Sequence, residues 1–428
     1  MSLYTSLFSG VSGLRNHQVM LNVIGNNISN VNTIGYKSAR TTFAEMFSQT
    51  RLSAFRPAGE SGGINPQQIG LGASVGSVDT MFTQGNFEAS GSATDLAIAG
   101  GGFFVVRQDG QKFYTRVGNF SFDAVGNMVL PGNGAILQGK LANPDGTIPP
   151  NASIQNLKLS LDMKAPPKAT TFAKLAGNLD SRAVQDTEVH STIQIYDSLG
   201  NSHTVEIKFT KTANANEWTW EASIPTGGTP PDPMTIASGG SGTITFDSNG
   251  ALLDFQYAGG ATALTVDPNN GAGMGQRIDL TPGRVGEFSG ITQTAQNSLV
   301  NMRDQDGYVS GTLENIAVDK TGRIQGKFSN GTIITLGQIM LAEFNNPGGL
   351  SKVAEGMYSA SGNSGEPILL IAGEGSNSTI NGGALEQSNV DLAEEFTKMI
   401  VAQRGYQSNA RIITTTDEIL QETVNLKR

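Results

Sequence analysis

The chain has 428 residues, a formal net charge of −9 and no cysteine. This length exceeds one ordinary domain and predicts two or three globular parts. The absence of cysteine excludes disulfides, cysteine-ligated metals and thiol catalysis. No basic cluster is present, so the sequence predicts no nucleic-acid binding, which needs lysine and arginine side chains to displace counterions from phosphates.

The composition favours short strands joined by tight turns. Hydrophobic residues make up 38% of the chain and charged residues 15%, whereas glycine is abundant with 54 residues. Glycine supplies the positive φ angles that tight turns need. No run approaches the roughly 18 apolar residues of a membrane span, so no membrane insertion is expected. The first residues lack the basic and apolar regions of a cleavable signal, so export is expected to use another route.

The N-terminal segment predicts a helix with a heptad pattern, because its apolar residues recur at alternating steps of four and three. These residues are Leu3, Leu7, Leu14, Leu21, Ile24, Ile28 and Val31, with Gly10 and His17 at the two intervening heptad positions, and Gly35 is the expected stop. Three glycines, Gly10, Gly13 and Gly25, each cost about 1 kcal/mol relative to alanine inside a helix. We therefore expect the isolated segment to be largely unfolded, and helical only when partners bury its seam.

The C-terminal segment repeats this design. Its heptad positions include Leu392, Phe396, Met399, Tyr406, Ile413, Leu420 and Val424. Asp391, with Glu394 three residues later, is typical of a helix start. Either helix alone could equally pack on its own domain. Two matching seams at opposite ends predict interfaces between many copies, with these apolar residues as the polymerisation seam.

The region between the two heptads predicts antiparallel β structure. Turn signals recur along it, among them Asp123–Asn127, Asp197–Asn201, Asp247–Gly250 and Asp319–Arg323. Alternating runs flank the turns, such as Thr192–Tyr196, Thr204–Phe209 and Gly242–Phe246. This spacing is typical of hairpins. Helices do not alternate with the strands, which argues against a parallel α/β sheet.

Two short motifs resemble ligand sites, but each lacks an essential part of the motif it resembles. Ile69–Gly76 resembles a dinucleotide-binding glycine motif, yet three residues instead of two separate its second and third glycines. Asp304–Gly307 could begin a calcium loop, yet Asn315 occupies the position that needs a glutamate. We expect a turn at both places.

The three histidines give a weak metal signal. His17 lies on a heptad position, where a packed or channel-facing role is expected. His190 and His203 flank one strand pair and could meet across a hairpin, but no carboxylate motif accompanies them. No catalytic motif stands out, so no catalytic, cofactor-binding or metal-binding residue is expected. A glycosidase carboxylate pair stays open, because acidic residues are abundant.

Long motifs at both ends resemble one family. The segment Asn22–Ser38 (NVIGNNISNVNTIGYKS) resembles the N-terminal signature of flagellar rod and hook proteins. Gly383–Phe396 (GALEQSNVDLAEEF) and Met399–Ala410 (MIVAQRGYQSNA) are similar to their C-terminal signature. Interior stretches are similar to hook proteins in particular: Ile195–His203, Asp306–Gly311 and Leu336–Phe344. Two others, Asp95–Phe104 and Tyr114–Phe120, resemble a stretch common to distal rod and hook.

This resemblance implies an α+β multidomain subunit. Residues 1–40 and 386–428 would form a coiled-coil-like helical core, and residues 41–76 an extended connector. Residues 77–145 and 284–385 would form a middle β domain, interrupted by an inserted outer β domain at 146–283. Such a subunit would be non-enzymatic, and its copies would polymerise into a flexible tube that passes motor torque to the filament.

The resemblance also implies partners and a location. The chain would bind copies of itself, the distal rod protein, the hook–filament junction protein, the hook cap and the flagellar type III export apparatus. Its location would be the hook and basal body, outside the cell. A distal rod protein is the nearest alternative, although such proteins are usually shorter. A secreted β-rich adhesin or polysaccharide hydrolase is an alternative of another class, and it leaves both heptads unexplained.

Overall fold

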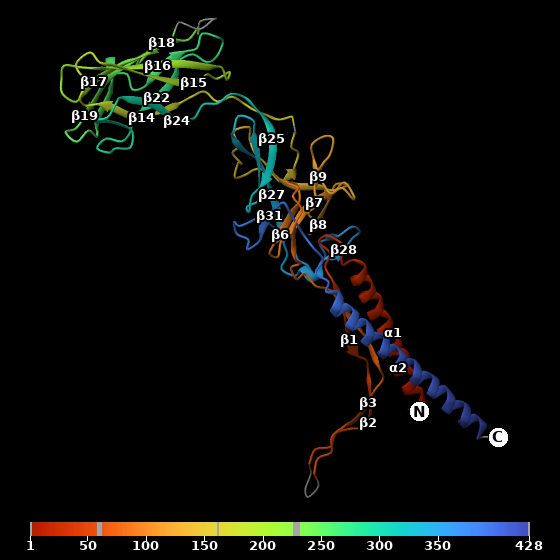
Figure 1. Cartoon of the computed structure of the whole chain (residues 1–428). Helices are drawn as coiled ribbons and strands as arrows, with labels where there is room; N and C mark the ends of the chain where they lie inside the picture. Colours follow the sequence, from red (N-terminus) through yellow and green to blue (C-terminus); the bar gives the residue numbers. More distant parts are fainter. Residues whose placement is uncertain (1, 58–61, 161, 226–231, 427–428) are drawn as a thin grey trace. The chain divides into compact units, whose positions relative to one another are not determined.

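The computed structural model describes residues 2–57, 62–160, 162–225 and 232–426 (Figure 1). A long helix lies at each end, α1 at Ser2–Ser29 and α2 at Leu392–Asn425, and most strand pairs between them are antiparallel. This confirms the predicted α+β class with terminal helices. The chain's contacts divide it into two units: Met1–Leu161, Ile316–Gly326 and Thr335–Arg428 form the first, and Asp162–Asn315 and Lys327–Ile334 form the second.

The asparagine-rich sequence ends α1 at Ser29, before the predicted stop at Gly35. The amide of Asn30 donates to the backbone oxygen of Asn26 at 2.8 Å, and the N–H of Val31 bonds three residues back instead of four. Asparagine side chains compete in this way for backbone groups and favour helix ends. Val31 therefore lies in the turn that follows α1.

The predicted start of α2 is confirmed. The carboxylate of Asp391 accepts hydrogen bonds from the N–H groups of Ala393, at 2.8 Å, and Glu394, at 3.2 Å. These two donors have no partner inside the helix, so the cap stabilises its first turn by typically about 1 kcal/mol. Glu394 and Glu395 add negative charge at the positive end of the helix dipole.

The first unit combines both helices with short strands. Its strands are β1 Ala39–Glu45, β2 Ser48–Leu52, β3 Gln67–Gly70, β4 Ala73–Thr80, β5 Phe87–Ala89, β6 Leu96–Ala99, β7 Phe103–Gln108, β8 Gln111–Thr115, β9 Ser121–Phe122, β10 Met128–Val129, β11 Ile136–Leu141, β12 Gln155–Asn156, β28 Ser351–Lys352, β29 Met357–Ser359, β30 Ile368–Ile371, β31 Thr379–Gly382 and β32 Ala384–Glu386. β1 pairs with β4, and β2 with β3, so much of the segment predicted as an extended connector is paired β structure.

The β part of the first unit has an aromatic core. Strands β11, β7, β8, β29 and β28 lie side by side in that order. Phe103, Tyr114, Phe344 and Tyr358 pack edge to face with ring centroids 4.8–6.0 Å apart. Such pairs add stability beyond the area they bury.

The second unit contains two packed sheets, and its strand β13 lies outside them, paired with β25 (Gly311–Val318). Its strands are β13 Lys164–Ala165, β14 Phe172–Asp180, β15 Glu188–Tyr196, β16 Ser202–Lys211, β17 Glu217–Ser223, β18 Thr235–Ser238, β19 Ser241–Phe246, β20 Leu252–Tyr257, β21 Leu264–Asp267, β22 Gln276–Thr281, β23 Ile291–Thr294 and β24 Leu299–Gln305. One sheet has the order β15-β16-β17-β19-β20, and the other β18-β21-β22-β14-β23. Alternate residues of β15, β16 and β17 point inward and join a core that contains Trp218 and Trp220.

The unit boundaries differ from the domain borders predicted from sequence, and the four-part division stays a prediction. Residues 291–305 belong to the second unit because β23 and β24 both pair with β14. Three further strands contain a boundary between the units: β25 Gly311–Val318, β26 Arg323–Phe328 and β27 Ile333–Glu343. The predicted borders at 146 and 283 fall in loops inside the first and the second unit.

The predicted turns share one geometry. In each, an aspartate accepts hydrogen bonds from the N–H groups two and four residues later at 2.8–2.9 Å. The turns begin at Asp123, Asp197, Asp247 and Asp319. A glycine three residues after each aspartate has a φ between +76° and +90°, which side chains disfavour. The repeated aspartate–glycine spacing thus explains the hairpins that the sequence predicted.

Candidate assembly surface of the terminal helices

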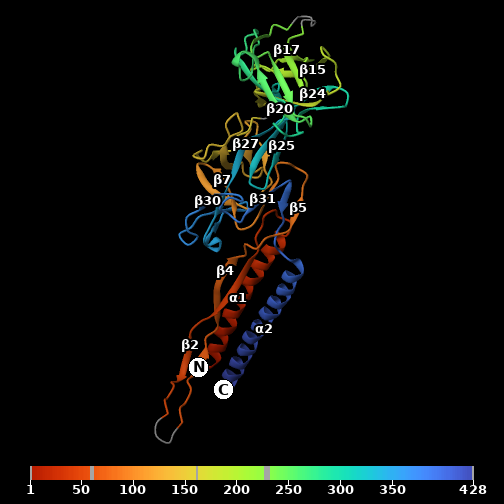
Figure 2. The same cartoon turned by 90° about the vertical axis from the view of Figure 1, so that its left-hand side faces the viewer.

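The helices α1 and α2 lie side by side and run in opposite directions (Figures 1 and 2). Near the end of α1, the amide of Asn27 donates to Glu395 Oε2 at 3.0 Å. Further toward the start of α1, His17 lies against Gly405. Residues nearer the start of α1 therefore contact residues nearer the end of α2.

Glycines allow the two helices to approach closely. A Cβ atom at Gly405 would lie 2.5 Å from the ring of His17, and one at Gly13 would lie 2.6 Å from the side chain of Asn409. A Cβ at Gly10 would come within 3.2 Å of Ile413. The glycines that weaken an isolated helix thus make room for a partner helix. The pairing of α1 with α2 of the same chain was not predicted from the sequence.

The predicted seam residues of α1 are partly covered in the single chain. Ile24 is buried, with 3% of its surface exposed. Four others are half-buried: Leu7, Leu14, Leu21 and Ile28. The side chain of Leu3 lies outside the described residues, and Val31 lies in the turn after the helix.

The predicted seam residues of α2 divide into two groups. Met399, Ile413 and Leu420 are half-buried. Leu392, Phe396, Tyr406 and Val424 are exposed, with 40%, 50%, 40% and 69% of their surfaces accessible. The polymerisation seam stays a prediction.

Sequence reasoning missed the residues on the inner face of α2. Glu395, Ala402 and Thr416 are buried, and Asn409 contacts α1. They recur every seven residues, as expected for paired helices. They are small or polar, so a search for apolar periodicity passes over them. Their seven-residue spacing was the available signal.

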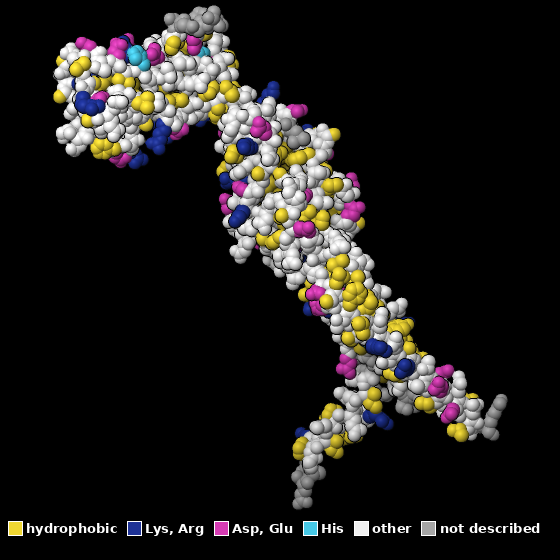
Figure 3. Space-filling view, in the orientation of Figure 1, with side chains coloured by type: hydrophobic (Ala, Val, Ile, Leu, Met, Phe, Trp, Pro, Cys, Tyr) yellow, Lys and Arg dark blue, Asp and Glu magenta, His cyan; other side chains and the backbone are white. Residues whose placement is uncertain are grey.

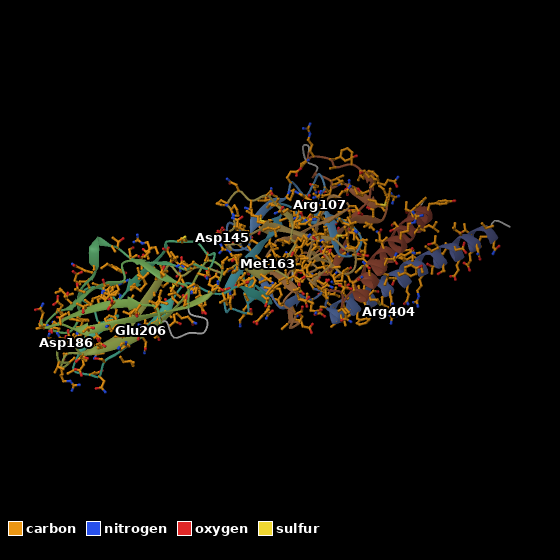
Figure 4. The ribbon with its side chains drawn as sticks, turned by 90° about the horizontal axis from the view of Figure 1, so that it is seen from above. Arg107, Asp145, Met163, Asp186, Glu206 and Arg404 are labelled. Carbon is orange, nitrogen blue, oxygen red and sulfur yellow. The ribbon has the colours of Figure 1, made fainter. Side chains whose placement is uncertain are left out.

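The outer faces of both helices carry apolar side chains in contact with solvent (Figure 3). On α2 these are Phe396, Ile400, Val401, Tyr406, Ile412, Ile419 and Val424, with Leu426 at its C-cap, and on α1 they are Tyr4 and Phe8. Arg404 of α2 is also exposed (Figure 4). An apolar surface of this extent is typical of an interaction site.

A polar cluster connects the end of α1 with the start of α2. The side chain of Asn27 donates to the backbone oxygen of Ala39 at 2.7 Å and accepts from the N–H of Ala39 at 2.9 Å. The hydroxyl of Tyr36 donates to Asn27 Oδ1 at 3.2 Å. Glu395, which accepts from Asn27, also pairs with Lys398 at 2.8 Å. Asn27 is 1% exposed, so these bonds satisfy an amide that water cannot reach.

A buried charge cluster lies beside this contact. Glu386 Oε1 pairs with Lys37 Nζ at 2.5 Å, and Glu386 Oε2 with Arg116 Nη1 at 3.4 Å. All three side chains are at most 1% exposed. Burial lowers the pKa of Lys37, and its contact with Glu386 opposes that shift. Burial likewise lowers the pKa of Arg116.

Hydrogen bonds complete the cluster. Lys37 donates to the oxygen of Thr83 at 2.7 Å, and Arg116 Nη2 donates to the oxygen of Gly100 at 2.7 Å. Among the described residues, Arg116 Nε has no hydrogen-bond partner, and the guanidinium lies 5.0 Å from the centre of the Phe103 ring. One carboxylate thus joins the segment after α1, the β part and the segment before α2. The three charged residues lie in three motifs that resemble flagellar proteins: Lys37 in Asn22–Ser38, Arg116 in Tyr114–Phe120 and Glu386 in Gly383–Phe396.

The histidines do not form the site that the sequence allowed. His190 pairs with Lys208, and His203 with Ile195, so the two histidines do not meet across the hairpin. His190 is exposed and His203 is 4% exposed, because they lie on opposite faces of the sheet. His203 lies between two carboxylates, with Nδ1 2.7 Å from Asp232 and Nε2 3.1 Å from Asp197.

The other candidate motifs have structural roles. Residues 69–76 lie in β3, β4 and the connection between them. Asp306 accepts from the N–H and hydroxyl of Thr171 and pairs with Lys168 at 3.0 Å. No group of three metal-ligating side chains occurs in the described part of the chain. None of the described helices is long and apolar enough to cross a membrane.

Comparison with protein families gives four matches along the chain. Residues 7–37 match the family described as Flagella basal body rod protein, and residues 97–162 match Flagellar hook protein FlgE/F/G D1 domain. Residues 169–308 match Flagellar basal body protein FlaE D2 domain. Residues 381–426 match Flagellar basal body rod FlgEFG protein C-terminal.

Individual proteins are similar over nearly the whole chain. The flagellar hook protein FlgE of Borreliella burgdorferi is 39% identical, with 99% of each chain covered. FlgE of Treponema pallidum is 36% identical with the same coverage, and FlgE of Salmonella typhimurium is 33% identical over 99% of this chain and all of that protein. The crystal structure of Helicobacter pylori flagellar hook protein FlgE2 has a TM-score of 0.51 at 16% identity, over 70% of this chain and 100% of that chain. The last likeness concerns the fold alone.

Proposed function

Because this chain belongs to the family of flagellar hook proteins, we propose that its copies polymerise through the outer faces of α1 and α2. The protein is a structural subunit of the bacterial flagellar hook, and it assembles with copies of itself. The flagellar hook is its location. The family has a structural role, and we propose that this chain has no catalytic activity.

One observation carries the proposed surface: large apolar side chains of α2 face solvent, although the small or polar Glu395, Ala402, Asn409 and Thr416 face α1. Phe396, Ile400 and Val401 are 50%, 59% and 61% exposed. Removing apolar surface from water favours association by roughly 25 cal/mol per Å². The same patch recurs on every copy of a helical polymer, so its contribution is repeated along the tube.

The proposed seam consists of the heptad residues together with this exposed patch. In a polymer, a contact that one copy makes with the next is repeated by every subunit, and open helical assemblies arise when such contacts do not close into a ring. The helices would form the wall around a central channel. We further propose that contacts in the second unit change as the tube bends, which lets it act as a joint between rod and filament.

The substitution Phe396→Asp tests the surface. An unpaired carboxylate in a packed seam costs several kcal/mol. We expect this variant to remain monomeric and to keep its β units folded, as measured by electron microscopy and circular dichroism. Phe396→Leu is the matched control, because it keeps an apolar side chain, and it should still form tubes. Normal tubes from Phe396→Asp would contradict the assignment of this face.

The partners of the tube follow from its place in the flagellum. We propose the distal rod protein at the base, the junction protein and the hook cap at the growing end, and the type III apparatus for export. A distal rod subunit would form a straight tube and a hook subunit a curved one. Electron microscopy of tubes formed by this chain tests the choice, and straight tubes would favour the distal rod.

We propose that the second unit shapes the tube without being needed to build it. The helices and the buried charge cluster all lie in the first unit. Removing Asp162–Asn315 and inserting a Gly/Ser bridge should therefore leave tube formation intact and alter curvature. Electron microscopy should show tubes of changed shape. Tubes of normal curvature would contradict this role of the second unit.

A further inference from the structure

A buried histidine of the second unit bridges two acidic side chains. His203 lies near the start of β16 on the inner face of its sheet, and 4% of its side chain is exposed. Its Nδ1 lies 2.7 and 2.9 Å from the two oxygens of Asp232, and its Nε2 lies 3.1 Å from Asp197 Oδ2. The side chain of Asp197 is fully buried, and that of Asp232 is 21% exposed. Both ring nitrogens of His203 therefore face a carboxylate in a place that water hardly reaches.

These distances fit a charged ring. A neutral imidazole has one N–H group, and its other nitrogen is an acceptor. An ionised carboxylate only accepts hydrogen bonds. Both contacts are therefore hydrogen bonds when both nitrogens carry a proton, which makes the ring of His203 a cation. In the neutral ring, one nitrogen lone pair would face a carboxylate oxygen with no proton between them.

Asp197 keeps its negative charge, so it does not supply the missing proton. Its carboxylate accepts from the N–H groups of Leu199 and Asn201 at 2.9 and 2.8 Å, and from the side-chain amides of Asn201 and Asn270 at 3.0 and 2.6 Å. Burial would raise the pKa of Asp197, but hydrogen bonds from Asn270, Asn201 and His203 outweigh it and lower that pKa. The proton between Asp197 and His203 therefore belongs to the ring.

His203 is the only basic side chain in the segments that meet here. Residues 195–205, 232–238 and 264–276 contain three aspartates, no lysine and no arginine. The third aspartate, Asp267, accepts from a backbone N–H of its own loop at 2.6 Å. Arg277 follows in β22, but it is 59% exposed and pairs with a carboxylate on the outer face of that strand. Loss of the ring proton would thus leave two carboxylates with no cation in these segments to offset them.

The two contacts of His203 hold three segments together at one end of the second unit. Asp197 belongs to the turn between β15 and β16, and it accepts from Asn270 in the loop between β21 and β22. Asp232 lies three residues before β18, and its Oδ1 also accepts from the N–H of Met234 at 3.0 Å. Met234 is 3% exposed and belongs to the core. Since β18 is an edge strand that pairs with β21, the bond from His203 anchors the start of an edge strand.

We propose that His203 is a pH-sensitive switch that holds the segment Asp232–Ser238, which contains β18. With both ring protons in place, the cation joins Asp232 to Asp197 and the segment is held. Loss of one proton places a lone pair against a carboxylate and releases the segment. Histidine changes charge between about pH 5 and pH 8, so the stabilising contribution is present at the acidic end and is lost as the pH rises. The switch lies within the second unit and does not depend on how copies assemble.

Denaturation of the full chain from pH 5 to pH 8 tests the switch. Both tryptophans lie in the second unit, so their fluorescence reports on it. For the native chain, we expect the equilibrium constant of unfolding to rise roughly tenfold over this range, because a hydrogen bond to a charged group is lost. His203→Gln keeps a polar side chain without an ionisable group, and it should lose this dependence. A native chain without the dependence, or a His203→Gln variant that retains it, would overturn the proposal.

His190→Gln is the matched control. His190 lies in the neighbouring strand β15 with Nδ1 2.8 Å from Glu206, but its side chain is 51% exposed, so water screens the pair. This variant should keep the pH dependence of the native chain. A dependence that disappears equally in both histidine variants would contradict a specific role of His203.

Hydrogen exchange shows whether the expected segment is released. After correction for the intrinsic exchange rate at each pH, the amides of residues 234–238 should lose roughly tenfold more protection between pH 5 and pH 8 than those of β16. Asp232→Ala removes the anchoring carboxylate without changing the ring, and it keeps the test open if His203→Gln does not fold. In this variant the segment should exchange rapidly at both pH values. Equal loss of protection across the second unit, or native protection of the segment in Asp232→Ala, would contradict the switch.

Discussion

The second unit and the paired terminal helices differ in what each buries within a single chain. The second unit encloses a core that includes Trp218 and Trp220, which are 0% and 1% exposed. The helices bury glycine, asparagine, glutamate and alanine against each other, and they expose large apolar side chains such as Phe396. Burial of apolar surface is the main favourable term in folding.

This difference indicates where each region obtains its stability. The core of the second unit is complete without other copies. The helices gain less from their own contact, because Ile413 packs there beside small and polar residues such as Gly405 and Asn409, and because their glycines disfavour the helical state. They are therefore expected to reach full stability only when neighbours cover their outer faces. The predictions below separate the two regions experimentally.

Replacing the carboxylate of the buried charge cluster should have the largest effect. In Glu386→Gln, Lys37 and Arg116 stay buried without their counterion, and such a loss typically costs about 3–5 kcal/mol. We expect the first unit to unfold at lower denaturant concentration. Hydrogen exchange in β7 and β8 would measure the loss.

Tryptophan fluorescence provides an internal control for this variant. Both tryptophans of the chain lie in the second unit, so their signal should be unchanged in Glu386→Gln. Glu374→Gln, at an exposed position of the first unit, should leave both signals unchanged. An unaltered first unit in Glu386→Gln would show that the charge cluster does not join the helices to the β part.

The contact between the helices should respond to a single methyl group. In Gly405→Ala, the new Cβ would lie 2.5 Å from the ring of His17, so that ring or the helices must shift. Overpacking of this kind typically costs about 1–3 kcal/mol. Tubes of this variant should dissociate at lower temperature, as measured by light scattering. Tubes as stable as those of the native chain would contradict the close approach of α1 and α2.

An acid-dependent loss of stability is expected in the second unit, at Asp306. Burial would raise the pKa of Asp306, but hydrogen bonds from Thr171 and the contact with Lys168 outweigh it and lower that pKa to about 2. The unfolded chain has an aspartate pKa of about 3.9. Asp306 therefore stabilises the folded state above about pH 4, and this contribution is lost as the pH falls toward 2.

The variant Asp306→Asn should weaken this dependence. Denaturation followed by tryptophan fluorescence between pH 4 and pH 2 measures it. Glu221→Gln is the control, because that side chain is 66% exposed. An identical pH profile for Asp306→Asn and the native chain would show that Asp306 does not anchor the second unit.

The smallest predicted effect is a gain in stability, whereas the variants above lose stability. A Cβ at Gly25 would meet nothing within 4 Å, so Gly25→Ala removes the helical cost of glycine without a clash. We expect α1 to gain up to about 1 kcal/mol. Tubes should dissociate at slightly higher temperature than native ones. A loss of stability would mean that Gly25 contacts a neighbouring copy in the tube.

Local sequence patterns predicted the secondary structure well. The aspartate–glycine turns, the alternating strands of the second unit and the Asp391 cap are all present in the structure. Each depends on residues close together in the chain, so a short window contains the whole interaction. The end of α1 was predicted too late, because asparagine side chains take over its last backbone bonds.

Contacts between distant segments could not be predicted in the same way. The inner face of α2 consists of small and polar residues, so it gives no hydrophobic signal. The meeting of Lys37, Arg116 and Glu386 brings together three motifs that are far apart in sequence. No periodicity within any one of these motifs reveals the other two.

Hydrogen exchange of the soluble monomer and of the assembled tube tests the central claim most directly. We expect amides of α1 and α2 to exchange rapidly in the monomer, while those of β14 to β17 are protected. In the tube, both helices should become protected, because neighbours then cover their outer faces. Strong protection of α1 and α2 in a verified monomer, equal to that of β14 to β17, would contradict the claim that assembly completes the terminal helices.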